Sequence, residues 1–273
     1  MAPEHPTHRP RRLPPRRRRV ATTAAAVRDL LRTQVLQGRY DDRPLPDELA
    51  LQRLHGTSRG AVRAALELLR DEGLIQRHQG SGTFVAALKA THRSDRLHAL
   101  QTSGTGERIT HEGLGCEVLP APDVVAELLD LPAGHPLVRL DRRTVSGPEV
   151  VGVWTTYLAV EHGAPLTTGA VDLRGDYYDV LEQLVGEPIG YATMSTEAVA
   201  ADPVVAEALT VPVGAPLLRM ERVVHLADGR PVDFGVGRLR GDRVRLSNIQ
   251  RRRSARAAPV AAVGGRAGAR SNR

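Results

Sequence analysis

Residues 58–85 read SRGAVRAALELLRDEGLIQRHQGSGTFV, and this stretch decides the fold of the N-terminal part of the chain. Ser58 is a suitable N-cap, because its hydroxyl accepts a hydrogen bond from a free backbone N–H of the first helical turn. An apolar stripe at helical spacing follows, formed by Val62, Ala65, Leu66 and Leu69. Gly73 ends the predicted helix. The β-prone runs on either side of residues 79–82 indicate a tight hairpin.

The predicted helix carries basic groups on its first turns. Arg59 and Arg63 are four residues apart and therefore share one face, and Gly60 between them leaves room for a close approach. An arginine fork pairs with guanine O6 and N7 or holds a phosphate. A solvated amphipathic helix with ordinary surface arginines has the same pattern. The helix alone therefore leaves both interpretations open.

The residues upstream favour a groove-reading helix. Pro46 and Asp47 predict the start of a short helix, and residues 55–57 form a turn into the second helix, as in a helix-turn-helix. A third apolar stripe at helical spacing lies in residues 22–36. The glycines of residues 79–82 belong to a hairpin tip rather than a phosphate loop, because β-prone residues follow them. Three helices and a hairpin predict a winged helix.

This region resembles the winged helix-turn-helix of GntR-type bacterial transcription regulators. The resemblance is carried by Leu-Pro at 45–46, Glu48, Leu51, Gly56, Ser-Arg at 58–59, Val-Arg at 62–63, Ala-Leu at 65–66 and EGLIQRHQGSGTFV at 72–85. It implies that the helix arginines enter the major groove and that the hairpin serves as the wing. The residues that we expect to contact DNA are Ser58, Arg59, Gly60, Arg63, Arg77, His78, Gln79, Gly80 and Gly82.

Length and charge are consistent with this interpretation. The chain has 273 residues, enough for two domains, and its net charge of +7 suits a polyanionic partner. Arginines concentrate in both tails, so we expect a disordered basic arm at 1–20 and a disordered basic tail at 248–273. Such tails add salt-dependent phosphate affinity or serve only for solubility, and the sequence leaves both roles open.

Several classes of protein are disfavoured. Cys116 is the only cysteine, which excludes an intramolecular disulfide, and no Cys/His cluster has zinc spacing. We therefore expect no metal and no cofactor. No apolar run is long enough to span a membrane and no secretion signal is present, so we expect no membrane partner and a cytoplasmic protein, nucleoid-associated when bound to DNA.

The C-terminal part contains an internal repeat. After the winged-helix domain at 21–87, residues 88–111 lack periodicity and predict a linker, and a second domain spans 112–247. Residues 122–145 and 202–225 agree at eleven of 24 positions without a gap. Each copy predicts a short helix, a Pro-Gly turn and an outgoing strand. We therefore expect two similar halves around one sheet, with a ligand cleft between them.

The repeat also places two arginines. Arg139 and Arg142 are three residues apart in a predicted strand, so alternation puts them on opposite faces. They cannot both line one pocket through a regular strand. A surface salt bridge is the alternative role for each.

The second domain resembles the UTRA effector domain of the HutC branch of these regulators. That resemblance implies a chorismate lyase-like fold, an antiparallel sheet flanked by helices, so the predicted class is α+β. The matching residues are VRLDRR at 138–143, Tyr157, Asp-Leu at 172–173, Tyr-Asp-Val-Leu-Glu at 178–182, Gly-Arg-Pro-Val-Asp at 229–233 and Arg-Gly-Asp-Arg at 240–243.

The pocket positions of that family are less well matched. Asp176 stands where the family often has a serine, Trp154 where it often has a glutamate, and Asp233 where it has a longer acid. Because an acid repels a phosphate, we hypothesise that the ligand is not a phosphosugar or that the pocket has changed function. Asp176 attracts a cationic ligand or caps the helix that starts near Tyr177. The expected effector residues are Arg139, Arg142, Trp154, Asp176, Tyr178 and Asp233.

Together these patterns predict a sequence-specific DNA-binding regulator whose affinity for a near-palindromic operator is set by a small-molecule effector. The family resemblance implies that it is a repressor. We expect a homodimer that spaces two winged helices on the operator. A non-specific architectural DNA-binding protein is the alternative, but it does not require the second domain. A chorismate lyase-like enzyme is a further alternative. We expect no enzyme, since no nucleophile or metal motif is visible.

Overall fold

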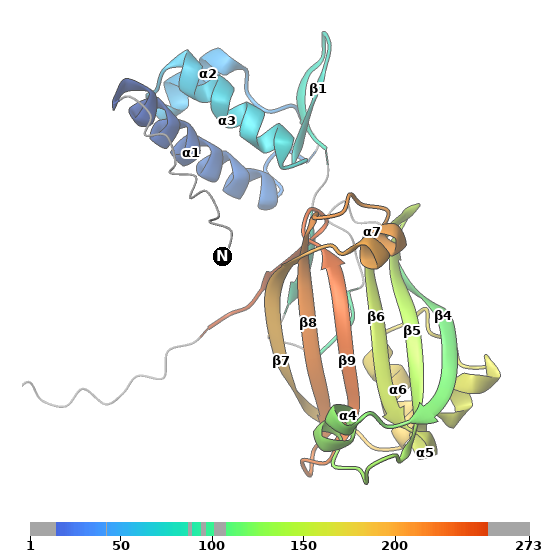
Figure 1. The fold of residues 1–273 in the computed structure, drawn as a ribbon. Coiled ribbons are helices and arrows are strands. Elements are labelled where there is room, and N and C mark those ends of the chain that lie inside the picture. Colours follow the sequence, from blue (N-terminus) through green and yellow to red (C-terminus); the bar gives the residue numbers. More distant parts are fainter. Residues whose placement is uncertain (1–14, 42, 87–88, 94–96, 101–107, 251–273) are drawn as a thin grey trace, which may run out of the picture.

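The computed structural model describes residues 15–41, 43–86, 89–93, 97–100 and 108–250. They form a helical unit with a hairpin and, below it in Figure 1, a unit built on one large sheet. We call residues 15–86 the winged unit and residues 108–240 the sheet unit.

The winged unit has the predicted order of elements. It consists of α1 (Pro15–Leu36), α2 (Glu48–His55), α3 (Arg59–Asp71), β1 (Ile75–His78) and β2 (Gly82–Val85). The strands β1 and β2 pair as an antiparallel hairpin. Asp47 caps α2 by accepting from the N–H of Ala50 at 2.7 Å, and Ser58 caps α3 by accepting from the N–H of Ala61 at 3.3 Å. The two short helices therefore begin where the sequence predicted.

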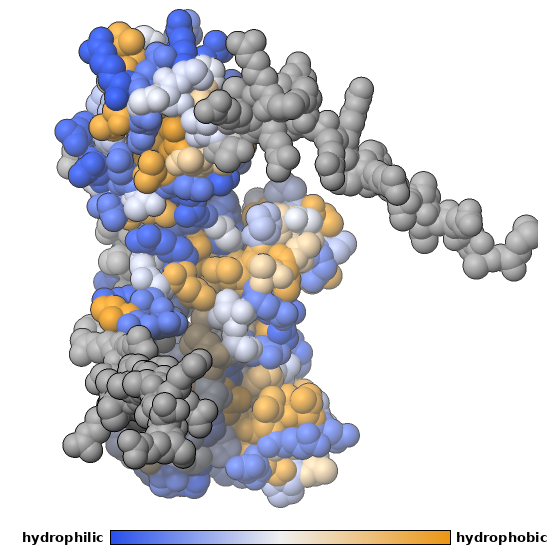
Figure 2. All heavy atoms as spheres, turned by 90° about the vertical axis from the view of Figure 1, so that its left-hand side faces the viewer, coloured by the Kyte–Doolittle hydropathy of each residue, from blue (hydrophilic) through white to orange (hydrophobic). Residues whose placement is uncertain are grey.

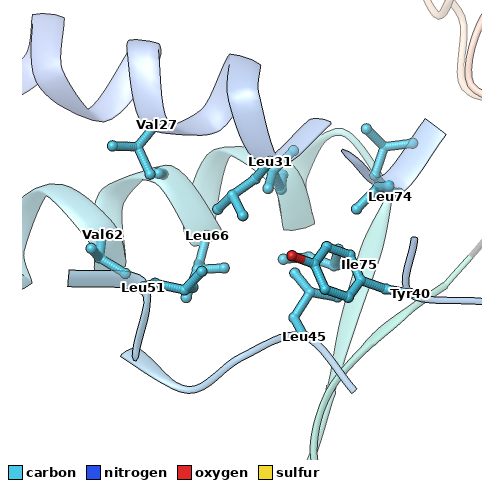
Figure 3. Close-up of a cluster of buried hydrophobic side chains, with 12 residues drawn as sticks. Val27, Leu31, Tyr40, Leu45, Leu51, Val62, Leu66, Leu74 and Ile75 are labelled. Atoms are coloured by element: carbon cyan, nitrogen blue, oxygen red, sulfur yellow. The ribbon is translucent and has the colours of Figure 1, made fainter. Parts of the chain in front are cut away.

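A single apolar core holds the winged unit together. Side chains of α1 and α3 point toward one another (Figure 3). Leu74 and Ile75 at the start of the hairpin, with Tyr40 and Leu45 from the segment between α1 and α2, close one end of the core. Leu31, Leu51 and Leu69 are fully buried. Burying each such leucine contributes about 1.5–3 kcal/mol to the stability of the unit. This packing fixes the orientation of α3, so that its polar face is left to solvent.

The sheet unit contains six antiparallel strands in the order β4-β5-β6-β9-β8-β7. The strands are β4 (Ile109–Pro120), β5 (Pro136–Ser146), β6 (Glu149–Ala159), β7 (Ile189–Ala200), β8 (Pro216–Leu226) and β9 (Pro231–Arg240). The helices are α4 (Asp123–Leu128), α5 (Val160–Gly163), the 3-10 turn η1 (Ala164–Thr168), α6 (Tyr177–Val185) and α7 (Pro203–Leu209). In Figure 1, α4 and α7 lie at opposite ends of the sheet and α6 lies behind it.

The sequence repeat corresponds to the two halves of this sheet. Strands β4–β6 form one half and β7–β9 the other, and the halves meet where β6 pairs with β9. The registers correspond: Glu117 pairs with Arg139, and Glu197 pairs with Arg219. A register shift follows Thr144 in one half and Val224 in the other, and these residues pair with Gly152 and Asp233. Gly152 and Asp233 therefore occupy equivalent positions.

The structure differs from the expected domain boundaries. Helix α1 begins at Pro15, so part of the expected disordered arm is helical, and residues 1–14 lie outside the described residues. The expected linker contains β3 (Ala90–Arg93), which pairs in parallel with β10 (Val244–Ser247). It also contains the start of β4. Of the expected tail, residues 248–250 lack regular structure and residues 251–273 lie outside the described part.

The pair β3–β10 connects the two units. Arg245 on β10 donates to the hydroxyl of Thr91 at 2.7 Å and to the carbonyl of Leu36, the last residue of α1, at 3.2 Å. Lys89 donates to the carbonyl of Gly241 at 2.7 Å, where β9 has just ended. A long-range strand pair thus ties the end of α1 to the end of the sheet.

The outer surface is mainly hydrophilic on the face that Figure 2 shows, with hydrophobic areas interspersed over both units. Among the residues that the structure describes, no helix is both long and apolar enough to cross a membrane.

Candidate functional site

A groove lies between α3 and the hairpin of the winged unit, and we call it the reading groove. Four arginines line it, namely Arg59, Arg63, Arg70 and Arg77, together with Gly82 and residues of the segment 44–49. The side chain of Arg59 is 73% exposed although its Nε donates to Glu48 at 3.0 Å. An exposed pair of this kind exchanges its partner at little free-energy cost. The groove can therefore present several guanidinium groups to a polyanion.

The hairpin tip requires glycine. Gly80 has φ of +78° and Gly82 of +115°, a region that residues with a Cβ rarely adopt. His78 packs edge-on against Phe84, with ring centroids 5.5 Å apart. The tip is thereby a narrow, exposed projection that can approach a nucleic-acid backbone.

The structure brings together only part of the residues expected to contact DNA. Arg59, Arg63, Arg77 and Gly82 line the reading groove. The others are exposed beside it, namely Ser58, Gly60, His78, Gln79 and Gly80. A Cβ on Gly60 would meet no atom within 4 Å, so no internal contact requires this glycine. Sequence reasoning missed Arg70, although its position seven residues after Arg63 places it on the same helix face.

A second site lies inside the sheet unit, between the sheet and α6, and we call it the arginine cavity. It encloses about 480 Å³ that protein atoms do not fill, part of it open to solvent. Its walls come from most elements of the unit, from residue 92 and from residues 98–100. The lining residues are His92, His98, Ala99, Leu100, His111, Arg142, Thr144, Trp154, Tyr177, Tyr178, Met194, Met220, Arg222 and Leu239.

Two buried arginines from equivalent positions of the repeat define this cavity. Arg142 and Arg222 are 3% and 6% exposed. The guanidinium carbon of Arg142 lies 3.6 Å from the ring centroid of Tyr177, and that of Arg222 lies 4.8 Å from the ring centroid of Tyr178. Aromatic faces attract such cations most strongly where water is excluded. The rings of α6 thus help to keep both charges in the interior.

One buried carboxylate balances part of this charge. Asp233 is fully buried and lies 3.3 Å from Nε of Arg222. It accepts a hydrogen bond from the hydroxyl of Tyr177 at 2.8 Å, and Arg222 donates to the hydroxyl of Tyr178 at 3.0 Å. Among the described residues, Arg142 donates only to the hydroxyl of Thr156, at 3.3 Å. The network is therefore centred on Arg222.

The two arginines differ in pKa because their surroundings differ. Burial lowers the pKa of Arg142 to about 10. Burial also acts to lower the pKa of Arg222, but its interactions with Tyr178 and Asp233 outweigh burial and raise it. Burial, together with Asp233, raises the pKa of the Tyr177 hydroxyl. At neutral pH both arginines are therefore cations and Tyr177 is a neutral donor.

Histidines from outside the expected pocket reach the cavity. Burial, together with His98 and Arg222 for His92 and with Arg142 for His111, lowers the pKa of both histidines to about 4, so both are neutral at pH 7. The Nε2 of His111 lies 3.2 Å from the carbonyl of Leu100, which only accepts. His111 is therefore the Nε2–H tautomer, and its Nδ1 accepts from the hydroxyl of Thr144 at 3.2 Å.

Of the six residues expected to bind an effector, three line the cavity: Arg142, Trp154 and Tyr178. Asp233 lies behind them and holds Arg222. Gly237 makes room for the indole of Trp154, since a Cβ there would lie 2.6 Å from the ring.

The other two expected residues do not line the cavity. Arg139 lies on the opposite face of the strand, as alternation requires, and pairs with Asp141 and Glu117 at 2.7 and 2.8 Å. Asp176 caps α6, accepting from the N–H groups of Tyr178 and Ala99 at 3.0 Å. Asp176 therefore has the capping role that the sequence offered as one alternative, and its charge also acts on His92 and His111 in the cavity wall.

Sequence reasoning also left residues out. Arg222 has a clear signal, because it is the repeat partner of Arg142. Tyr177 could have been found from its helical neighbour Tyr178. The histidines at 92, 98 and 111 carry no such signal, because only the path of the chain after the hairpin brings them to the cavity. Among the described residues, no group of three histidine, cysteine or acidic side chains could hold a metal ion.

Comparison with known families assigns both units. Residues 23–85 match the family model described as "Bacterial regulatory proteins, gntR family", and residues 104–245 match the UTRA domain. The matched ranges correspond closely to the winged unit and to the sheet unit with β10.

Individual relatives extend across both units. The chain is 32% identical to the HTH-type transcriptional regulator Rv0792c of Mycobacterium tuberculosis over 234 residues, 80% of this chain and 82% of that protein. It is 27% identical to the HTH-type transcriptional repressor NagR of Bacillus subtilis, covering 80% of this chain and 90% of that one. The crystal structure of PhnF from Mycobacterium smegmatis superposes with a TM-score of 0.60 at 23% identity, over 82% of this chain and 99% of that chain.

Proposed function

This chain belongs to the gntR family of bacterial regulatory proteins and carries a UTRA domain, and on that premise we propose that it is a repressor that binds its operator as a homodimer. The family consists of DNA-binding transcription regulators with an effector-binding domain. The name of NagR describes a repressor, which supports repression as the sign of regulation. The HutC branch, a near-palindromic operator and a cytoplasmic, nucleoid-associated location belong to the same proposal.

The reading groove is the observation that carries the DNA-binding part of the proposal. Arg63 on α3 and Arg77 on the hairpin line the same groove, so the recognition helix and the wing can contact adjacent parts of one duplex. We assign base reading in the major groove to Arg59 and Arg63, and backbone contacts to Arg77 and the glycine tip. Ser58 and Gly60 allow the helix N-terminus to approach a phosphate closely.

The arginine cavity is the proposed effector site. It adjoins β3 through His92, and β3 pairs with β10, whose Arg245 holds the last carbonyl of α1. A ligand that favours one position of β3 therefore biases the placement of the winged unit. The free-energy change in operator binding comes from the difference between the ligand's binding free energies to two placements of β3 and the winged unit.

Selection of bound DNA from a random pool, followed by footprinting, tests this function. A single short inverted repeat, protected by two copies of the chain, is the expected result. Uniform protection without a preferred sequence would instead identify a non-specific architectural protein. We propose no enzymatic activity, because the buried groups of the cavity form a binding network and include no activated nucleophile.

A further inference from the structure

The two halves of the sheet supply two arginines to the cavity but only one carboxylate. Asp233 serves Arg222, and the equivalent position in the other half is Gly152. A Cβ on Gly152 would lie 2.4 Å from the side chain of Leu239, so this position accepts no larger residue without repacking. Within the described residues, Arg142 has no carboxylate within ion-pair distance. The duplication thus leaves one arginine without the acid that the other has.

Several polar atoms at this point are buried without a hydrogen bond, although two of them, Nε of Arg222 and Oδ1 of Asp233, form the ion pair described above. They are Nε of Arg142, Nε and Nη2 of Arg222, and Oδ1 of Asp233. Leaving charged donors buried and unbonded is costly. Nε of Arg142 and Nη2 of Arg222 remain as guanidinium N–H groups without any partner in the described residues. The group that satisfies them is an acceptor, and a charged acceptor forms the strongest hydrogen bonds.

The charges that face the cavity set the charge of that acceptor. Among the described residues that line or directly back the cavity, two guanidinium groups face one carboxylate, and His92 and His111 are neutral at pH 7. The carboxylate of Asp176 lies beside the cavity and acts on both histidines, so it leaves still less room for a second negative charge. Around the opening, His98 lies beside His92, and Asp176 is held by the N–H groups of Ala99 and Tyr178. A singly charged anion therefore neutralises the buried site. A doubly charged phosphate would leave an uncompensated negative charge in a region of low dielectric.

The remaining walls are apolar. Trp154 covers the strand at Gly237, and Met194, Met220 and Leu239 complete the lining. Polar groups nearby are already engaged: the hydroxyl of Tyr177 bonds Asp233, and both ring nitrogens of His111 have partners. A sugar would bring several hydroxyl groups that require partners of their own. A flat unsaturated body packs against indole and thioether groups without this requirement.

We infer that the arginine cavity binds a small monocarboxylic acid with a planar unsaturated body, its carboxylate between Arg142 and Arg222 and its body against Trp154 and Met220. The inference rests on the proposed function only in taking this ligand as the effector. The charge and the walls of the cavity thus disfavour a phosphosugar.

Calorimetry on the full chain without DNA tests the ligand class. The probes are benzoate and nicotinate, with benzamide as the neutral isostere of benzoate, and glucosamine 6-phosphate as the phosphosugar. We expect at least one acid to bind with one site per chain, and benzamide to bind about tenfold more weakly or worse, because it lacks the charge. Binding of neither acid, equal binding of benzamide, or tighter binding of glucosamine 6-phosphate would overturn the inference.

Variants locate the site. Arg142→Gln should weaken binding of the acid by about tenfold or more. Arg139→Gln, on the opposite face of the same strand, should leave it unchanged. Since the neutral isostere requires no substitution, the inference stays testable if Arg142→Gln fails to fold. If the two arginine variants bind equally, the assigned site is wrong.

Operator binding separates this inference from the proposed function. Acids that bind the chain without changing operator affinity contradict effector control and leave the ligand class standing. Operator binding that responds to other metabolites, with no binding of the acids, contradicts the ligand class alone.

Discussion

Replacing Asp233 with asparagine should destabilise the sheet unit strongly. The substitution replaces the carboxylate with a neutral amide of nearly the same shape. The amide oxygen can still accept the hydrogen bond from the hydroxyl of Tyr177. What is lost is the charge beside Arg222, at 3.3 Å, with Arg142 also buried in the same cavity. Removing one partner of a buried ion pair costs about 3–5 kcal/mol. We expect the lower end, about 3 kcal/mol, because the hydrogen bond to Tyr177 is retained.

Urea unfolding followed by fluorescence excited in the tryptophan band measures this loss. Trp154 is the only tryptophan of the chain and lies in the cavity wall, 5.2 Å from the guanidinium of Arg222. The signal therefore reports the sheet unit without contribution from tryptophan in the winged unit. The matched control is Asp228→Asn in the β8–β9 turn, whose carboxylate is 52% exposed in its pair with Arg230. That variant should unfold at the same urea concentration as the parent chain.

The reasoning would be refuted if Asp233→Asn lost less than about 1 kcal/mol, the value typical of an exposed pair. The charges of the cavity would then not be coupled as the distances imply. A second readout sharpens the test: with Asp233 neutralised the cavity carries two excess positive charges, so a bound anion should stabilise the variant more than it stabilises the parent chain.

Four further perturbations test other parts of the molecule. Arg63→Ala should cost about 1–3 kcal/mol of specific operator binding, and an unchanged ratio of specific to non-specific affinity would show that Arg63 reads no base. Gly82→Ala should lower the free energy of unfolding of the winged unit by about 1–2 kcal/mol, because φ is +115° there, as thermal unfolding of the variant can check. Acidification should destabilise the sheet unit. The pKa of His92 and of His111 is about 4 in the folded chain and 6.5 in the unfolded chain, so between these pH values the unfolded state binds more protons than the folded state. The free energy of unfolding therefore decreases as the pH is lowered. Each histidine should remove about 2 kcal/mol between pH 7.5 and 5, and a flat stability curve over that range would contradict their burial as neutral rings. Arg245→Ala should leave anion binding intact but reduce the ligand-induced change in operator affinity, which in coupled systems is about 5- to 150-fold; an undiminished response in gel-shift titrations would exclude this contact as the link.

The winged unit could be predicted from local signals because local interactions determine it. Asp47 and Ser58 cap their helices in the way that their side chains favour, and the glycines of the hairpin tip have the left-handed backbone that the turn requires. Arg70 was not predicted, because it lies beyond the first turns of α3, where Arg59 and Arg63 form the basic pair. The groove, however, extends to a later turn of the helix on the same face.

Some features of the sheet unit could be predicted from the repeat, whereas others depend on contacts between residues far apart in the sequence. The repeat placed Arg142 and Arg222 at equivalent positions, and strand alternation separated Arg139 from the cavity. The role of Asp176 required the position of residue 99, whose N–H group it holds. Strand β3 was invisible locally, because a four-residue strand is stabilised by pairing with β10, more than 140 residues away in the sequence.

Strand β3 also connects the cavity wall to the winged unit. His92 lies on β3 and lines the cavity, while Thr91 on the same strand accepts from Arg245, which in turn donates to Leu36 at the end of α1. Alternation points neighbouring side chains of β3 in opposite directions, so a movement of this short strand changes the cavity wall and the support of α1 together. Since α1 packs against α3 along most of the winged core, such a movement reorients the helix that carries the reading arginines. Under the proposed effector control, a ligand therefore need not contact the winged unit: it is enough that it binds more tightly to one position of β3 than to another.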